Sequence, residues 1–212
     1  AILLALLLNE MRAPRLKRIY QTVYTFPHFL SWVVVGTMVT NIFASNGSIN
    51  AVVSALGGER VNFLSSRALF RPLLYLTANW KEMGWSAIIY MATIAGIDPT
   101  LYEAATVDGA NRFQQMLHVT LPGLQQTIVV LFILAVGKMM NAGFDQIFNL
   151  QNSAVKSVSE IIDTYIYTIT FQSMPNYGFS TAVGMFKAVI NFALLLTCNQ
   201  VAKKVSGKGL FT

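Results

Sequence analysis

The sequence predicts an all-α membrane protein, a polytopic helix bundle in which about five spanning segments are covered. The composition predicts this first, because 54% of the 212 residues are hydrophobic and only 11% are charged. A soluble domain carries roughly 25% charged residues, since its surface must interact with water. The apolar residues also gather in runs of the length that crosses a hydrocarbon core as a helix. We therefore expect lipid to surround most of the chain.

The apolar runs define the expected spans. Residues 1–8 are typical of the inner end of a helix and lack the basic start of a signal peptide, so we expect the natural N-terminus to be missing. Four further runs are long enough to span a bilayer. They cover residues 19–45, 71–95, 121–140 and 181–202. We treat residues 1–212 as one transmembrane domain with a polar loop at residues 96–122.

The basic residues predict the orientation of these spans, because short cytoplasmic loops are enriched in Lys and Arg. One side of the alternating topology carries eight of them and the other carries four. The first set is Arg12, Arg15, Lys17, Arg18, Arg112, Lys203, Lys204 and Lys208, and the second is Arg60, Arg67, Arg71 and Lys156. The polar loop therefore belongs to the cytoplasmic side.

Other functional classes find little support in the sequence. The net charge of +6 does not indicate nucleic acid, because the basic residues lie at the ends of apolar runs without interleaved aromatics. The single cysteine, Cys198, lies inside an apolar run, as a small core residue would. His28 and His118 have no second ligand nearby in sequence, so we expect no metal site.

The polar loop predicts two short helices. Asp98 can cap a helix start, and Pro99 suits its first turn. Gly109 can take the left-handed conformation that ends this helix. We expect a second helix over residues 110–118, followed by Pro122 at the start of the next span, where its missing amide costs little. A helix of about ten residues rises about 15 Å, so the first one cannot span a bilayer and should form a rigid surface projection.

The same loop resembles a known signature. Glu103-Ala104-Ala105, then Gly109 four positions after the second alanine, then Val119-Thr120-Leu121-Pro122, resemble the EAA signature of binding-protein-dependent permeases of ATP-binding-cassette importers. The family more often has isoleucine where this chain has Val119. The spacing over some twenty positions carries the resemblance, because Glu-Ala-Ala alone is ordinary helix composition.

The resemblance implies a MetI-like type I importer permease, multi-pass in the bacterial cytoplasmic membrane. It implies that the loop is a coupling helix in a groove of a cytoplasmic ATPase, where small alanines allow close approach and the acids suit a basic groove. The implied partners are two ATPase subunits, a second homologous permease and an extracytoplasmic solute-binding protein. The implied coupling residues are Glu103, Ala104, Ala105, Asp108, Gly109, Leu121 and Pro122.

The permease itself is expected to be no enzyme and to bind no cofactor, with ATP and Mg²⁺ on the partner ATPase. In agreement, residues 1–212 contain no G-x-x-x-x-G-K-[ST] motif, the loop that binds the phosphates of ATP. The segments 80–85, 163–167 and 182–187 look like the branch that serves carbohydrates and oligosaccharides. Two alternatives stay open: a permease of this fold for another solute such as an amino acid, and a secondary transporter, although the latter should show repeated halves.

Ionisable residues in the spans are candidates for a substrate path, because a charge at the bilayer centre costs about 2.5 to 3.5 kcal/mol on insertion scales. Three lysines from three spans suggest a path for an acidic or heavily hydroxylated sugar. Snorkelling to the headgroups would explain Lys138 and Lys187 equally well, and pairing with another subunit would explain Lys81 and Glu82. The candidates are Lys81, Glu82, Trp85, Lys138, Asn141, Asp145 and Lys187.

Overall fold

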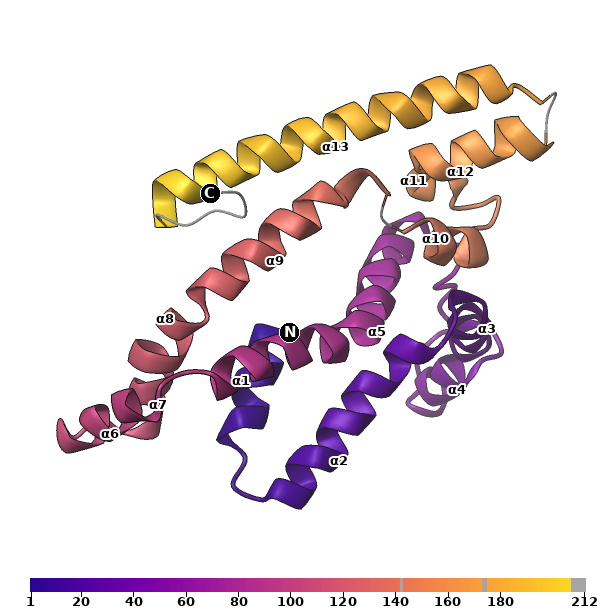
Figure 1. Ribbon diagram of the computed structural model, residues 1–212. Helices are drawn as coiled ribbons and strands as arrows, with labels where there is room; N and C mark the ends of the chain where they lie inside the picture. Colours follow the sequence, from indigo (N-terminus) through magenta and orange to yellow (C-terminus); the bar gives the residue numbers. More distant parts are fainter. Residues whose placement is uncertain (142, 173–174, 207–212) are drawn as a thin grey trace. The chain divides into compact units, whose positions relative to one another are not determined.

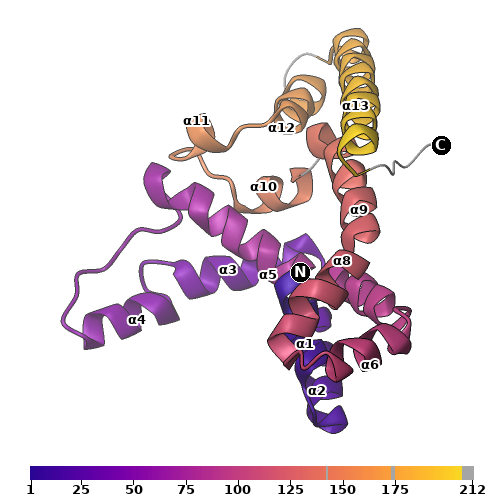
Figure 2. The ribbon, with the colours of Figure 1, turned by 90° about the vertical axis from the view of Figure 1, so that its left-hand side faces the viewer.

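Figures 1 and 2 show the computed structural model, which describes residues 1–141, 143–172 and 175–206. Every regular element in these ranges is helical, so the predicted all-α class is confirmed. Lys208, counted above in the cytoplasmic tail, lies outside the described residues.

The longer helices are α1 (Ile2–Glu10), α2 (Pro14–Thr25), α3 (Trp32–Phe43), α4 (Ser48–Ala55), α5 (Arg67–Ala95), α6 (Pro99–Val107), α9 (Gln125–Gly137), α10 (Phe144–Leu150) and α13 (Tyr177–Ser206). The shorter helices are α7 (Arg112–Gln115), α8 (Leu121–Gly123), α11 (Lys156–Ser159) and α12 (Ile162–Tyr167). Single 3-10 or π turns are η1 (Phe26–Phe29), η2 (Met116–Thr120), η3 (Met139–Asn141) and η4 (Thr168–Gln172).

The chain forms two compact units, and the first holds the polar loop. Unit 1 comprises Ala1–Phe26, Glu82–Met140 and the chain from Ala188 onward. The buried residues of its core come from α1, the second half of α5 and the junction of α8 and α9. They are Ala5, Leu6, Ala87, Tyr90, Ile94 and Leu124. Leu124 is completely buried and therefore ties the end of the polar loop to this core.

Unit 2 comprises Pro27–Lys81 and Asn141–Lys187. Its core joins α3, the first half of α5, α10 and the segment before α11. The buried core residues are Val35, Val39, Phe70, Leu73, Leu74, Ile147, Leu150 and Val155. Helices α3 and α10 approach closely at Gly36, where an added Cβ would lie 3.1 Å from the Cβ of Asn149. The Gln146 amide crosses this interior and donates to the Leu74 carbonyl at 2.7 Å, so the polar group is satisfied.

The run expected as a span over residues 19–45 is not one continuous helix: it is a pair of helices, Pro14–Phe29 and Trp32–Ala55, bent by 102°. The helix α2 ends at Thr25, and the 3-10 turn η1 around Pro27 follows. Ser31 then starts α3 as its N-cap, with its hydroxyl accepting from the Val34 amide at 3.3 Å. Proline and a serine cap are local stop and start signals that outweigh the continuous hydrophobicity of the run.

The number of spans that length and composition support is also lower than the five expected. The segment Tyr177–Lys204 is the one helix of the described residues that is long and apolar enough by itself. Two pairs of bent helices pass the same criterion together, which allows up to three. One pair covers the run expected at residues 121–140, and it bends by 54° between Arg112–Gly123 and Gln125–Gly137. The 29-residue helix α5 is long enough, but polar residues such as Lys81 and Glu82 lower its hydropathy.

Candidate functional site

The helix α6 begins where the sequence predicts. The Asp98 carboxylate accepts from the Thr100 amide at 2.9 Å, and Pro99 occupies the first turn. Hydrogen bonds from the backbone and the hydroxyl of Thr100 lower the pKa of the Asp98 carboxyl below its ordinary value. The helix start is therefore closed by a charged cap that lies in solvent.

The C-terminus of α6 is closed just as locally. The Gly109 amide donates to the Thr106 carbonyl at 3.0 Å, and the Ala110 amide donates to the Ala105 carbonyl at 2.9 Å. These are the two bonds of a Schellman motif, which requires a left-handed residue after the helix. Gly109 supplies it with φ +80°, so the predicted left-handed glycine is confirmed.

The second helix of the loop begins later than predicted. Asn111 caps α7 in a capping box: its side chain accepts from the Gln114 amide at 3.0 Å, and its own amide donates to the Gln114 side chain at 2.8 Å. The helical chain then continues through the π turn η2 into α8. The expected helix over residues 110–118 is thus shifted, because residues 109 and 110 are used to end α6 and Asn111 to cap α7.

Two side-chain contacts fix α6 to the elements that follow it. The Gln115 amide donates to the Thr106 hydroxyl at 3.0 Å and to the Ala110 carbonyl at 3.1 Å. The hydroxyls of Tyr102 and Thr120 lie 3.0 Å apart, and Thr120 is only 1% exposed. The loop is therefore held against the start of the next span as one piece.

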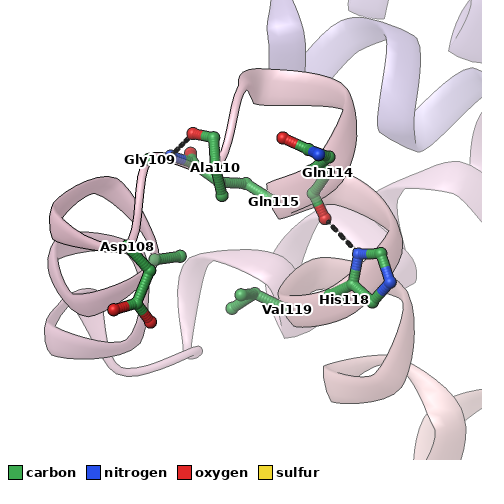
Figure 3. Close-up of a pocket in the computed structure, with 8 residues that line it drawn as sticks. Asp108, Gly109, Ala110, Gln114, Gln115, His118 and Val119 are labelled. Atoms are coloured by element: carbon green, nitrogen blue, oxygen red, sulfur yellow. Dashed lines mark hydrogen bonds between the residues drawn. The ribbon is translucent and has the colours of Figure 1, made fainter.

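The outward face of α6 combines small, apolar and acidic residues. Glu103, Ala104 and Asp108 are exposed, Ala105 is half-buried and Val107 is 88% exposed. Beside this face, a pocket lies between the end of α6 and the following turns (Figure 3). Its wall includes Asp108, Gly109 and His118. The face therefore presents small, apolar and acidic side chains next to a pocket.

The other predicted coupling residues, Leu121 and Pro122, lie in α8 at the base of the loop. Leu121 packs against the core of unit 1, and Pro122 is exposed. Pro122 does not begin the span proper, because the chain bends after α8 and α9 starts at Gln125. The structure thus gathers all seven predicted coupling residues in α6, its C-terminal turn and α8. Their role in coupling stays a prediction.

The candidates for a substrate path lie in different surroundings. Lys81 and Lys187 are each only 5% exposed. The Lys81 ammonium donates to the His28 carbonyl at 2.7 Å and lies 5.6 Å from the centre of the Trp32 ring. The Lys187 ammonium forms an ion pair with Asp163 of α12. The Lys187 charge is therefore paired with an acid, whereas the Lys81 ammonium is held by a carbonyl and an aromatic ring, all within unit 2.

The remaining path candidates are more accessible. Lys138, Asn141 and Asp145 are exposed, Trp85 is 43% exposed and Glu82 is half-buried. Lys138 ends α9, whereas Asp145 lies in the first turn of α10. Substrate contact by any of these seven residues stays a prediction.

Sequence reasoning missed the contacts that hold the site together. Tyr102, Gln115 and Thr120 were not among the candidates, although they anchor the loop. Asp163, the partner of Lys187, was not a candidate either. A lysine within a span indicates that an acid could lie opposite it. Because Asp163 is 24 residues away from Lys187, the sequence alone did not identify it as the partner. Within residues 1–141, 143–172 and 175–206, no group of three or more His, Cys, Asp or Glu is placed to hold a metal ion.

The all-helical fold, its long apolar helix and its short capped surface helix are those of a membrane-embedded transport subunit. Residues 1–207 match the family described as "Binding-protein-dependent transport system inner membrane component", and the chain belongs to this family. This assignment confirms the resemblance of the EAA loop. It also disfavours a secondary transporter, since the family serves binding-protein-dependent systems.

Two relatives from Bacillus subtilis (strain 168) are similar over nearly the whole chain. The polygalacturonan/rhamnogalacturonan transport system permease protein YteP is 44% identical over 211 residues, and protein LplB is 43% identical over 211 residues. Both alignments cover 99% of this chain. The chain spans 65% of the length of YteP and 66% of the length of LplB.

Solved structures share the fold. The chain matches a bacterial ABC transporter involved in the import of the acidic polysaccharide alginate, with TM-score 0.92 and 36% identity. That match covers 97% of this chain and 72% of the other. A bacterial alginate ABC transporter in complex with an alginate pentasaccharide-bound periplasmic protein gives TM-score 0.93 at 36% identity, over 99% and 73% of the two chains. The MetI-like permease fold is thereby shown.

Proposed function

We propose that this chain is one of two homologous permease subunits of an ATP-binding-cassette importer in the bacterial cytoplasmic membrane. It forms half of the path by which a carbohydrate, most simply an acidic oligosaccharide, crosses that membrane. The helix α6 is the observation that carries this proposal. It is closed at both ends by its own neighbours and fixed to the next span, so a push on its exposed face moves the span instead of unwinding the helix.

The proposal divides the work between subunits. Two cytoplasmic ATPases bind ATP with Mg²⁺ and hydrolyse it, while this chain binds neither and catalyses no reaction. Their grooves receive α6 through Glu103, Ala104 and Asp108, where the alanine allows close approach and the carboxylates complement basic side chains. An extracytoplasmic solute-binding protein delivers the sugar.

The substrate class rests on the relatives and on the charges of the chain. YteP is named for polygalacturonan, whose galacturonate units carry carboxylates, and alginate is described as acidic. The net charge of +6 agrees with an anionic substrate, although membrane orientation also uses basic residues. An amino acid substrate has no comparable support.

Co-purification tests the coupling role. The tagged chain is extracted from membranes of cells that express the transporter, and the bound ATPase and its ATP hydrolysis are measured. We expect Glu103→Ala together with Gly109→Val to weaken ATPase binding by about tenfold or more, as a lost hot spot does. Phe192→Leu on the exposed face of α13 is the matched control and should change nothing. An ATPase that never accompanies the wild-type chain, or that stays bound to the double variant, contradicts the proposal.

A further inference from the structure

A second pocket lies in unit 2, in the segment between α9 and α13. It is formed by the end of α10, the loop into α11, the helix α12 and the turn η4. Its wall carries side-chain amides, hydroxyls, two aromatic rings and one lysine, and no carboxylate is among the described residues that line it. With the polar loop predicted in the cytoplasm, the one crossing by the bent pair that ends in α9 places this segment toward the outer side, where an imported solute arrives.

Aromatic rings form a continuous strip at this pocket. The rings of Phe148 and Tyr167, which both line it, lie 4.9 Å apart at an angle of 72°. Phe144 extends the strip on one side at 5.4 Å from Phe148, and Phe171 extends it on the other at 5.3 Å from Tyr167. Phe148 and Phe171 are exposed. Aromatic faces bind the C–H face of a pyranose ring, while nearby amides and hydroxyls bind its hydroxyl groups.

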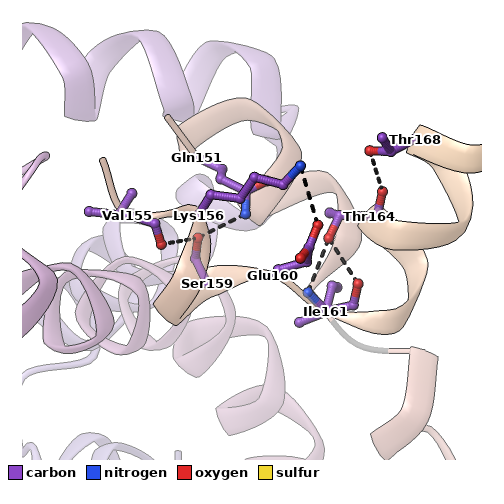
Figure 4. A network of polar contacts seen from close by, with 8 residues as sticks. All are labelled: Gln151, Val155, Lys156, Ser159, Glu160, Ile161, Thr164 and Thr168. Atoms are coloured by element: carbon purple, nitrogen blue, oxygen red, sulfur yellow. Dashed lines mark hydrogen bonds and ion pairs between the residues drawn. The ribbon is translucent and has the colours of Figure 1, made fainter. Parts of the chain in front are cut away.

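Lys156 supplies the positive charge of the pocket. Its ammonium lies 3.5 Å from the Glu160 carboxylate one helical turn on (Figure 4), and its side chain is 51% exposed. An exposed ion pair of this kind contributes little to stability. The Lys156 side chain is therefore held loosely and can turn to a carboxylate on a ligand. The Glu160 carboxylate competes with that ligand for the Lys156 ammonium.

The frame behind these side chains is rigid. The buried Ser159 hydroxyl accepts from the Gln151 amide at 2.9 Å and donates to the Val155 carbonyl at 2.9 Å (Figure 4). The Arg71 guanidinium of α5 donates to the Val158 carbonyl at 2.8 Å, and the Asn152 amide donates to the Leu64 carbonyl at 2.9 Å. The pocket wall is thus preformed, which reduces the entropy lost on binding.

We propose that this pocket is a subsite for one uronate unit of an acidic oligosaccharide, with Tyr167 and Phe148 against the sugar face and Lys156 at its carboxylate. The inference rests on the proposed function and names a place for the substrate outside the buried lysines of the spans. The occupant is a sugar and not a protein, because the strip of rings is bordered by the Ser153 hydroxyl and the Gln172 amide, which can bind the hydroxyl groups of a sugar ring.

Equilibrium binding to the purified permease–ATPase complex in nanodiscs, without the solute-binding protein, tests the subsite. The probes are trigalacturonate and its carboxyl-reduced derivative. We expect Lys156→Met to raise the Kd for trigalacturonate about three- to fivefold and to leave that of the reduced probe unchanged. Tyr167→Leu should raise both about fivefold, because the ring face is lost for either probe. Glu160→Gln should lower the Kd for trigalacturonate, a gain that misfolding cannot produce.

Two exposed residues outside the pocket provide controls, namely Lys204→Met and Phe132→Leu, and both should bind like the wild type. Unchanged Kd values in Lys156→Met and Tyr167→Leu overturn the subsite, as does absence of binding to a wild type that imports trigalacturonate in cells. Both results leave the proposed function intact, whereas a wild type that imports no sugar overturns both proposals. Weaker binding of the sugar-free solute-binding protein, with sugar affinity unchanged, would make the pocket a protein contact and overturn the subsite.

Discussion

At the scale of single residues, Gly109 is a position where backbone conformation alone restricts the sequence. An added Cβ would meet nothing within 4 Å, so only φ +80° opposes a side chain. We expect Gly109→Ala to destabilise the loop by about 1 kcal/mol and Gly109→Val by more, because a β-branched residue tolerates positive φ least. Thermal unfolding of the purified complex, together with its ATPase binding, measures the difference. Equal effects of the two substitutions would mean that the positive φ of Gly109 does not set the cost.

Asp98 provides a prediction about pH. Its pKa is lowered in the folded protein, so its contribution is present above the unfolded value of about 3.9 and is lost as the pH falls through the folded value. We expect amide exchange in the first turn of α6, corrected for intrinsic rates, to speed up below that range. Asp98→Asn keeps a side-chain cap without the charge, so amide exchange in this turn should no longer depend on pH beyond the intrinsic rates. In Asp98→Ala, which has no cap, the same amides should exchange fast at every pH. A first turn of equal protection in Asp98→Ala and wild type would show that the cap is unimportant.

At the scale of secondary-structure elements, the contact between Tyr102 and Thr120 joins α6 to the base of the next span. Tyr102→Phe leaves the buried Thr120 hydroxyl without this partner, which costs about 1 to 3 kcal/mol. We expect the double variant Tyr102→Phe with Thr120→Val to be less destabilised than the sum of the two single variants. A double-mutant cycle on the unfolding of the complex measures this coupling. Strict additivity would mean that the two hydroxyls do not stabilise the loop together.

The ends of α6 could be predicted because their signals are adjacent in sequence. Asp98 with Pro99 and Gly109 with Ala110 each satisfy backbone groups within a few residues, and the structure confirms both ends. The break near Pro27 was missed, since hydrophobicity over a long run was weighted above one proline and one serine. The bend within the run at residues 121–140 lies close to Pro122, yet its position at Leu124 depends on burial in the core.

The contacts of the candidate path residues could not be predicted at all. Lys81 reaches the carbonyl of a residue 53 positions earlier, and Lys187 reaches an acid 24 positions earlier. No periodicity or local motif specifies such pairs, because they depend on how helices distant in sequence are packed. Composition could identify these lysines as unusual in an apolar segment, but only the fold gave their partners.

At the scale of the whole molecule, the chain has two separate apolar cores, which predicts local responses to core damage. Phe70 in unit 2 and Leu124 in unit 1 are both completely buried. We expect Phe70→Ala to cost about 3 to 5 kcal/mol and Leu124→Ala about 2 to 5 kcal/mol. Hydrogen exchange measured by mass spectrometry in nanodiscs should rise mainly within the unit that carries each substitution. A rise of equal size throughout both units would show that the chain opens as one cooperative body.

The closure of α6 by its own ends has a practical consequence for engineering. Residues 98–110 contain the cap, the helix and the terminal turn, and none of these bonds needs a neighbour from elsewhere in the protein. Grafted together with residues 111–120, which supply the Gln115 and Thr120 contacts of α6, this segment should keep its shape and display the same face in the loop of an unrelated helical hairpin. Under the proposed coupling role, a soluble mimic made in this way would compete with the permease for the ATPase groove, and would do so without a membrane.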